Sequence, residues 1–484
     1  MDGKGQRVKL TLGVNFIKHL AKSKKRILAL AFTLPFITRL IPELFFPVPV
    51  GFDTAIHLYG AKYNPFPDFK FRIFERFLLP YVYHSLGIEL TFFMKFYSPV
   101  IFALMTLLLT SYASYVLKWG PEKLLLLTLL LSLNPALLRM SWDNHSQNLA
   151  TLQLIALLLI LGRKPALPRL LAVIPLAVMI ALTHQLVSVI ALGILIFELF
   201  YLARPRLRLV PYITVILLAI LSIPAISPVL APNRSIPALQ SIAAEWNSGV
   251  DRIGLVNQAI AATWYTLPAS FFGIFRERRL LAWLATSAGV YLFALGVGNP
   301  TPVVPGRWAV YSVIPLTFFA ANAYRPRAGI RGVKAASLTL TILFTLSTGF
   351  GMVLPSGTAV TEMMHSSYPE FPPTLASSTA KKEHVEAIIK FTSYLNRNDD
   401  KACIITHYPW FFWWTGYYYK GKTIYNGPKY TDEKSLIEQI KSDTRLSKCG
   451  NKIYIIWFTG LAFAEEVQRL NELSLYELEN KRAP

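Results

Sequence analysis

The chain has 484 residues, of which 53% are hydrophobic and 16% are charged, and its mean hydropathy is +0.41. Soluble domains carry roughly 25% charged residues, so this composition excludes an ordinary globular protein whose whole surface faces water. The formal net charge of +22 would suit a nucleic-acid-binding protein, but the positions of the basic residues give it another explanation.

Long apolar runs predict an α-helical polytopic membrane protein. A membrane-spanning helix needs about 20 mostly apolar residues, and the runs lack the period-2 alternation of barrel strands. We predict about eleven spans, because roughly that many apolar runs are long enough to cross a membrane as a helix. They lie near 27–46, 97–117, 124–140, 149–162, 170–183, 186–203, 209–226, 257–275, 280–297, 308–324 and 335–354.

Every second connection between these spans is basic. Cytoplasmic loops of membrane proteins carry an excess of Lys and Arg, so the basic connections predict a cytoplasmic N-terminus and an outside C-terminus. The charge then sets orientation, and a nucleic-acid partner is not expected. The first apolar run lacks a convincing signal-peptide cleavage site and is expected to remain as a helix. The basic residues on the predicted inner side are Lys18, Lys22, Lys24, Lys25, Arg26, Lys118, Lys123, Arg163, Lys164, Arg169, Arg204, Arg206, Arg208, Arg276, Arg278, Arg279, Arg325, Arg327, Arg331 and Lys334.

The first predicted outer loop, about residues 47–90, is longer than a connection requires. It begins with Asp53 and His57, which lie one helical turn apart if a short helix starts at Asp53. Such a pair offers a general base and a phosphate-contacting group, although an Asp here also suits a helix cap. Further along, residues 69–79 alternate aromatic and charged side chains, including Arg72, which indicates a helix in the membrane interface.

Three other polar sites stand at predicted outer ends of spans. Residues 142–148 hold Asp143, His145, two Asn and a Gln in a tight turn, although Asp143 alone reads as a cap. His184 joins two spans, where a lone His is usually a solvated turn residue. Arg307 precedes Trp308 and suits a phosphate, or an anchor at the membrane interface. The coincidence of these sites on one face favours a functional site there.

The spans themselves contain few ionisable residues, and Glu198 is the main exception we identify. Ionisable groups within a membrane usually mark ion or proton paths, so their scarcity disfavours a pump or a coupled transporter. No phosphate loop, H-E-x-x-H, dinucleotide fingerprint or G-x-S-x-G is present in the sequence.

After Leu354 the composition changes. We predict a membrane domain over 1–354, a linker rich in Ser, Thr and Pro over 355–380, and a small outside α/β domain over 381–484. Helices are expected over 384–395, 435–440 and 461–473, and strands over 402–406, 423–425 and 453–458.

Both cysteines, Cys403 and Cys449, fall in this C-terminal domain. A disulfide can persist outside the cytoplasm, whereas two buried free thiols are the alternative. The sequence leaves both open. The aromatic run over 410–414 allows stacking on sugars, with burial as the other interpretation.

The chain resembles the GT-C superfamily, membrane glycosyltransferases that use polyprenyl-phosphate-linked sugars. The resemblance covers nearly the whole organisation, but only a few motifs carry it: Gly51-Phe52-Asp53, Trp142-Asp143 with Asn148-Leu149, Thr183-His184 and Arg307-Trp308, which look like boundary motifs of archaeal members. Two features depart from the family: Asp53 has no acidic neighbour, and Trp413-Trp414 is followed by Thr-Gly instead of the oligosaccharyltransferase signature W-W-D-Y-G.

The resemblance implies an enzyme at the plasma membrane that transfers a hexose or pentose from a polyprenyl (dolichyl-type) phosphate to a hydroxyl of a glycan, lipid or protein on the outer face. Asp53 would be the catalytic base. No cofactor is expected, and a divalent metal is not needed. The alternatives are a lipid-linked glycan polymerase or ligase, a multispan transporter, and an outer domain that binds glycan while the spans anchor it. The residues expected to bind the donor or its phosphate are His57, Arg72, Asp143, His145, His184 and Arg307.

Overall fold

A computed structural model gives the fold of the chain. By their contacts, the residues divide into two compact units: the first comprises 1–41, 66–77 and 96–373, and the second comprises 42–65, 78–95 and 374–484. The residues that the structure describes are 23–63, 73–143, 145–162, 167–203, 260, 262–274, 277–297, 306–324, 332–353, 382–406, 409–425, 433–442, 445–446, 449, 452–458 and 460–479.

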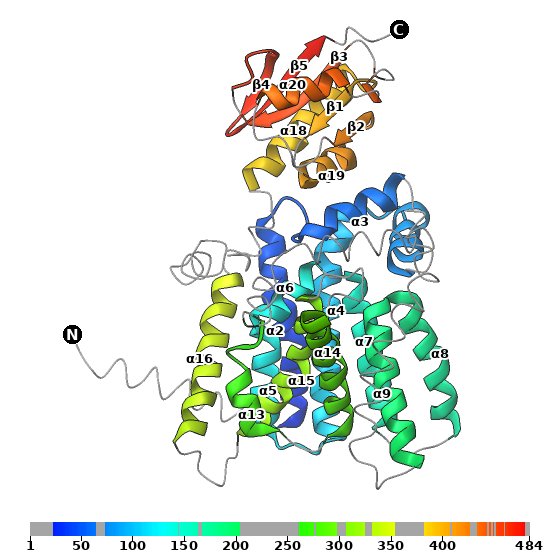
Figure 1. Cartoon of the computed structure of the whole chain (residues 1–484), viewed down its shortest axis with the longest axis vertical. Coiled ribbons are helices and arrows are strands. Elements are labelled where there is room, and N and C mark those ends of the chain that lie inside the picture. The colour runs from blue at the N-terminus through cyan, green and yellow to red at the C-terminus, as the bar shows by residue number, and fades with distance from the viewer. Residues whose placement is uncertain are drawn as a thin grey trace, which may run out of the picture. The chain divides into compact units, whose positions relative to one another are not determined.

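The first unit is built of packed helices (Figure 1). The long helix α2 ends in the second unit, and the long helix α4 begins there. Helix α15 packs against α5, α13 and α14, and α8 packs against α7 and α9. The helices are α2 (Lys24–Phe45), α4 (Leu90–Tyr115), α5 (Pro121–Leu133), α6 (Pro135–Asp143), α7 (His145–Leu161), α8 (Leu167–Thr183), α9 (Gln185–Ala203), α13 (Leu267–Gly273), α14 (Arg278–Val297), α15 (Gly306–Ala323) and α16 (Val333–Val353).

The apolar helices of the structure are those of a membrane protein. Among the described residues, α2, α4 and α16 are each long and apolar enough to cross a membrane, and α5 with α6 adds a fourth if the bent pair is one span. Shorter apolar helices lie at most of the other predicted spans. The predicted span over 209–226 lies outside the described residues, so the count of eleven and the orientation stay predictions.

The predicted span over 124–140 is two helices with a 53° bend between them. Helix α5 begins with Pro121 after Gly120, a common helix start. It ends at Leu133, because Asn134 precedes a proline and is therefore disfavoured in the helical conformation; Asn134 is extended, with ψ of 121°. The Asn134 side chain then caps α6 by accepting a hydrogen bond from the Leu137 N–H, 3.2 Å away.

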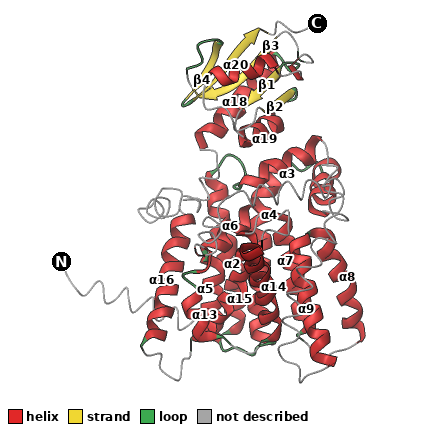
Figure 2. Ribbon diagram, viewed as in Figure 1, coloured by secondary structure: helices red, strands yellow, loops and turns green. Residues whose placement is uncertain are grey.

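The second unit contains a five-stranded sheet with the strand order β2-β1-β3-β5-β4; its strands are yellow in Figure 2. Strand β1 pairs in parallel with β2 and β3, whereas β5 pairs antiparallel with β3 and β4. The strands are β1 (Cys403–Thr406), β2 (Lys422–Tyr425), β3 (Lys452–Phe458), β4 (Glu465–Leu470) and β5 (Leu473–Glu479). The helices of the second unit are α3 (Phe52–Tyr63), α18 (Lys382–Asn398), α19 (Pro409–Tyr418) and α20 (Glu433–Ser442), and it also contains the π-helical turn η3 (Tyr81–Ser85). A second π-helical turn, η2 (Phe74–Leu78), lies in the first unit except for Leu78.

The helix predicted over 461–473 is wrong, because this segment forms β4 and the turn into β5. Its Ala, Glu, Gln and Leu content favours a helix. Asn471 has a φ of 57°, a left-handed conformation that Asn tolerates better than most residues, and it closes a tight turn. Pairing of β4 with β5 then outweighs the local preference.

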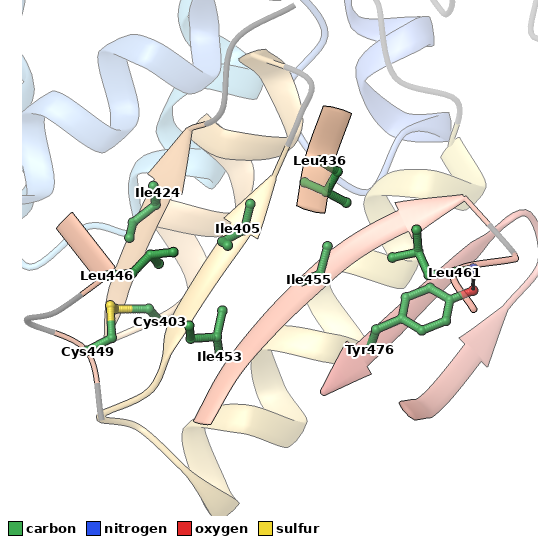
Figure 3. Packing of buried hydrophobic residues seen from close by; sticks show 10 residues of the cluster. All are labelled: Cys403, Ile405, Ile424, Leu436, Leu446, Cys449, Ile453, Ile455, Leu461 and Tyr476. Atoms are coloured by element: carbon green, nitrogen blue, oxygen red, sulfur yellow. Dashed lines mark hydrogen bonds between the residues drawn. A yellow bond between two sulfur atoms is a disulfide. The ribbon is translucent and has the colours of Figure 1, made fainter. Parts of the chain in front are cut away.

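The core of the C-terminal sheet contains a disulfide between Cys403 and Cys449, whose Cα atoms are 5.6 Å apart. The half-cystines lie in a buried apolar cluster (Figure 3). This resolves the alternative that the sequence left open, in favour of the disulfide. The other members of the cluster are Ile405, Ile424, Leu436, Leu446, Ile453, Ile455, Leu461 and Tyr476.

Candidate functional site

Asp53 and His57 lie on α3, as the sequence predicted. The helix begins at Phe52, so Asp53 stands in its first turn, where a carboxylate interacts favourably with the helix dipole. The Asp53 side chain lies outside the described part, whereas His57 is 8% exposed. The approach to α3 is fixed by Glu43 near the end of α2, which accepts a hydrogen bond from the Val50 N–H at 3.0 Å.

The polar cluster between α6 and α7 is turned into the protein. His145 is buried, and its Nδ1 lies 3.1 Å from the Ser98 hydroxyl. Its ring also contacts Phe74 and Tyr97. Asn148 donates to the carbonyl oxygens of residues 140 and 141, at 2.9 and 3.2 Å. The Asp143 side chain and Asn144 lie outside the described residues. His145 is thus held by neighbouring helices, and a phosphate contact from it stays a prediction.

His184 is the single residue between α8 and α9, and the expected solvated turn is not what forms there. Its side chain is buried, with 5% exposed. The His184 N–H donates to the Ile180 carbonyl at 2.9 Å, and its own carbonyl accepts from the Ser188 N–H at 3.1 Å. The two helices therefore meet at a tight junction that buries the imidazole.

The two arginines predicted to bind the donor phosphate, Arg307 and Arg72, have side chains outside the described part of the structure. Arg307 is the second residue of α15, but its side chain lies outside the described part, and Arg72 lies outside it entirely. The neighbouring Trp308 is fully buried. Its carbonyl accepts from Ser312, and Ser312 lies 2.9 Å from Ser287 of α14. Trp308 therefore packs inside the helices and is not an exposed interfacial anchor.

The sequence analysis named Glu198 as the main ionisable residue within the predicted spans. It overlooked a buried cation, Arg39. Arg39, within the predicted first span, is 0% exposed. Its Nη1 donates to the Ser132 carbonyl at 2.9 Å, and its guanidinium carbon lies 3.8 Å from the centre of the Phe102 ring. Ser132 is in the last turn of α5, where a cation is favourable. The arginine in an apolar run was the signal that could have found it.

Glu198 is held in an ion-pair cluster. Arg278 makes two hydrogen bonds of 2.9 Å to its carboxylate, and Arg279 approaches it to 2.8 Å. Arg279 also donates to the Leu161 carbonyl and pairs with Glu277, which accepts from the Tyr112 hydroxyl. These contacts tie α4, α7, α9 and the start of α14 together, so Glu198 serves packing of the helices.

The candidate residues therefore divide between the two units. Asp53 and His57 belong to the second, whereas Asp143, His145, His184 and Arg307 belong to the first. Their convergence on one face stays a prediction. Within the described ranges, no three His, Cys, Asp or Glu side chains are grouped as a metal ion would require.

Comparison with known proteins identifies the fold. No protein-family model matches the chain, and no curated protein sequence matches it. Among solved structures, it is similar to the arabinofuranosyltransferase AftD from Mycobacteria, with 12% identity, a TM-score of 0.49, and coverage of 95% of this chain and 40% of that one. The chain thus spans about two fifths of AftD.

A second solved structure matches along nearly its whole length. ArnT from Cupriavidus metallidurans, bound to undecaprenyl phosphate, is 14% identical with a TM-score of 0.52, and the match covers 95% of this chain and 98% of ArnT. This chain therefore shares the fold of ArnT.

Proposed function

We propose that the chain is a membrane glycosyltransferase of the GT-C type, which moves a sugar from a polyprenyl phosphate to an acceptor hydroxyl on the outer face of the plasma membrane. The observation that carries this proposal is the fold shared with ArnT over nearly all of both chains. ArnT was solved with undecaprenyl phosphate bound, so this fold holds a polyprenyl phosphate in at least one protein. The apolar helices supply the surroundings that such a lipid requires.

The proposed reaction is a direct displacement at the anomeric carbon of the donor sugar. Asp53 takes the proton of the acceptor hydroxyl while its oxygen forms a bond to that carbon. The bond between the carbon and the phosphate oxygen breaks, and polyprenyl phosphate leaves with the electron pair. Arg307, with His184 or Arg72, would stabilise the negative charge that develops on the phosphate. His57, Asp143 and His145 are proposed to line the donor site.

One observation favours the transporter alternative. Transporters often build their sites at interrupted helices, and α5 and α6 are an interrupted pair, which sequence reading did not detect. The break is filled by the protein itself, because Asn134 caps α6 and accepts a hydrogen bond from the Tyr265 hydroxyl at 2.8 Å. The transferase is therefore the better-supported function. A lipid-linked glycan polymerase or ligase would use the same lipid and the same face.

A transfer assay tests this proposal. The full chain, reconstituted in sealed lipid vesicles, would be incubated with polyprenyl phosphates that carry radiolabelled hexoses or pentoses, together with glycan and lipid acceptors. We expect labelled product to form along with free polyprenyl phosphate. Uptake of an intact substrate into vesicles, without cleavage of any donor, would identify a transporter instead.

A further inference from the structure

Tyr417 of α19 contacts two separate segments of the predicted first outer loop, the end of α3 and the residue before α4. Its carbonyl oxygen accepts a hydrogen bond from Lys62 Nζ of α3 at 2.8 Å, and that nitrogen lies 4.6 Å from the centre of the Tyr417 ring. Its hydroxyl donates to Glu89, just before α4, at 2.6 Å. All three residues belong to the second unit. One residue from the C-terminal part of the chain, through its backbone carbonyl and its side chain, therefore contacts two segments that lie more than 300 positions away in sequence.

The Glu89 side chain is itself held by hydrogen bonds to the start of α4. Its carboxylate accepts hydrogen bonds from the Phe92 N–H, at 2.9 Å, and from the Thr91 hydroxyl, so it caps the start of α4. Lys95 on the next turn of α4 donates to the Phe46 carbonyl at 2.6 Å, directly after α2. The Tyr417 hydroxyl is thus bonded to the carboxylate that caps α4, and Lys95 connects the same helix to the end of α2.

The packing of α3 on α19 leaves no spare room. A Cβ atom at Gly416 would lie 2.6 Å from Cε2 of Tyr59 on α3, well inside the separation of about 3.5–4.0 Å that non-bonded carbon atoms prefer. Movement of the Tyr59 ring is opposed by its contacts with the Phe412 and Trp413 rings, whose centres lie 6.0 and 5.4 Å from its own. Phe411 and Trp414 are buried. Phe412 and Trp413 are partly exposed but contact the Tyr59 ring, so every described aromatic residue of this run takes part in packing.

The pKa shifts of Lys62 and Tyr417 show how protonation affects this contact. Burial lowers the pKa of Lys62, and the negative charge of Glu89 acts in the opposite direction. Burial raises the pKa of the Tyr417 phenol, and its hydrogen bond to Glu89 adds to the rise. The phenol therefore stays protonated and donates to the carboxylate throughout the physiological pH range.

We infer that Gly416 and Tyr417 are positioning residues, which fix helix α3 and thereby the reach of Asp53 and His57. The C-terminal domain would then be part of the frame of the active site and not an appended glycan-binding module. The catalytic consequence rests on the proposed function, whereas the mechanical consequence does not. A displacement of about 1 Å at a reacting group can lower a rate by about 100-fold.

The test follows the position of α3 independently of activity. The two native cysteines are joined in a disulfide, so Ala61→Cys on α3, at a position only 3% exposed, introduces a single free thiol. In this background Gly416→Ala should raise the rate of maleimide labelling at residue 61 by about tenfold or more, since local opening exposes it. Transfer from a polyprenyl-phosphate sugar should fall by about 100-fold.

A second substitution separates positioning from general damage. Tyr59→Leu removes the ring that the new methyl group would strike, so Tyr59→Leu with Gly416→Ala should recover slow labelling and most of the transfer rate. Gly120→Ala is the matched control, because no atom lies within 4 Å of a Cβ built there. If Gly416→Ala yields no folded protein, Tyr417→Phe, which removes only the hydroxyl bonded to Glu89, takes its place and should raise labelling less.

Unchanged labelling in Gly416→Ala or Tyr417→Phe would overturn the inference. Faster labelling with normal transfer would leave α3 held by α19 but remove the catalytic consequence. If the wild-type chain transfers no sugar from any polyprenyl phosphate, the proposed function fails, and the labelling rates alone still decide whether these residues hold α3.

Discussion

At the scale of single residues, a carboxylate at position 53 has two physical roles that one substitution separates. In the first turn of α3 it stabilises the helix dipole, and in the proposed reaction it removes a proton. Asp53→Asn keeps the size and loses the charge, which costs about 0.3–1 kcal/mol of helix stability. A general base, in contrast, contributes about 100-fold or more to the rate.

We therefore expect Asp53→Asn to reach the membrane in normal yield and to lose about 100-fold or more in transfer rate. Yield, melting temperature and transfer from a polyprenyl-phosphate sugar would be measured on the same preparation. A stable variant with intact transfer would assign Asp53 to the helix alone and make Asp143 the next candidate for the base.

Arg307 distinguishes a donor contact from a structural cation. If it binds the phosphate, Arg307→Ala should raise the KM for the donor, and Arg307→Lys should recover only part, because an ammonium lacks the bidentate fork of a guanidinium. The measurement is the transfer rate over a range of donor concentrations at fixed acceptor. A KM equal to that of the wild type in Arg307→Ala would exclude the phosphate contact.

Sequence reading located residues along the chain better than it predicted their surroundings. It placed His145 and His184 at helix ends, as observed, yet both imidazoles are buried. It overlooked Arg39, because one cation barely changes the mean hydropathy of an apolar run of about 20 residues. Burial depends on which helices meet, and that information is spread over distant residues such as Ser98 and Ser132.

At the scale of elements, the bend at Asn134 is a small polar junction that substitution can probe. Asn134 caps α6 and accepts the Tyr265 hydroxyl. Asn134→Ala should cost about 1–3 kcal/mol, since it removes a cap and leaves a buried hydroxyl without its acceptor. Tyr265→Phe should cost about 1 kcal/mol, and the double variant less than the sum of the two. Melting temperatures in detergent would check this order. Additive losses would mean that the hydrogen bond contributes little.

Elements were predictable where local and tertiary preferences agree. The helices over 24–45 and 333–353 and the strands β1, β2 and β3 follow their predicted ranges within a few residues. The prediction failed where the two preferences conflict. Residues 461–473 have helical composition but form β4 and the turn into β5. The apolar run over 124–140 is interrupted because Pro135 follows Asn134.

At the scale of the whole molecule, the fold joins segments that the sequence keeps apart. Helix α3 belongs to one compact unit with the C-terminal sheet, although the sequence predicts the linker 355–380 as a boundary. That linker lies outside the described residues, and the predicted domain limits stay predictions. No pattern of composition could pair Lys62 with Tyr417, since their contact depends on packing between distant helices.

The orientation in the membrane is the remaining whole-molecule prediction, and the proposed outer active site depends on it. The positive-inside rule places Lys118 in the cytoplasm and the C-terminal domain outside. Both Lys118 and Glu438 are exposed, and the native cysteines are paired, so Lys118→Cys and Glu438→Cys each provide one accessible thiol. A membrane-impermeant maleimide should label Glu438→Cys in intact cells and Lys118→Cys only after permeabilisation. The reverse pattern would place Asp53 on the cytoplasmic side, where the proposed site could not act on an outer acceptor.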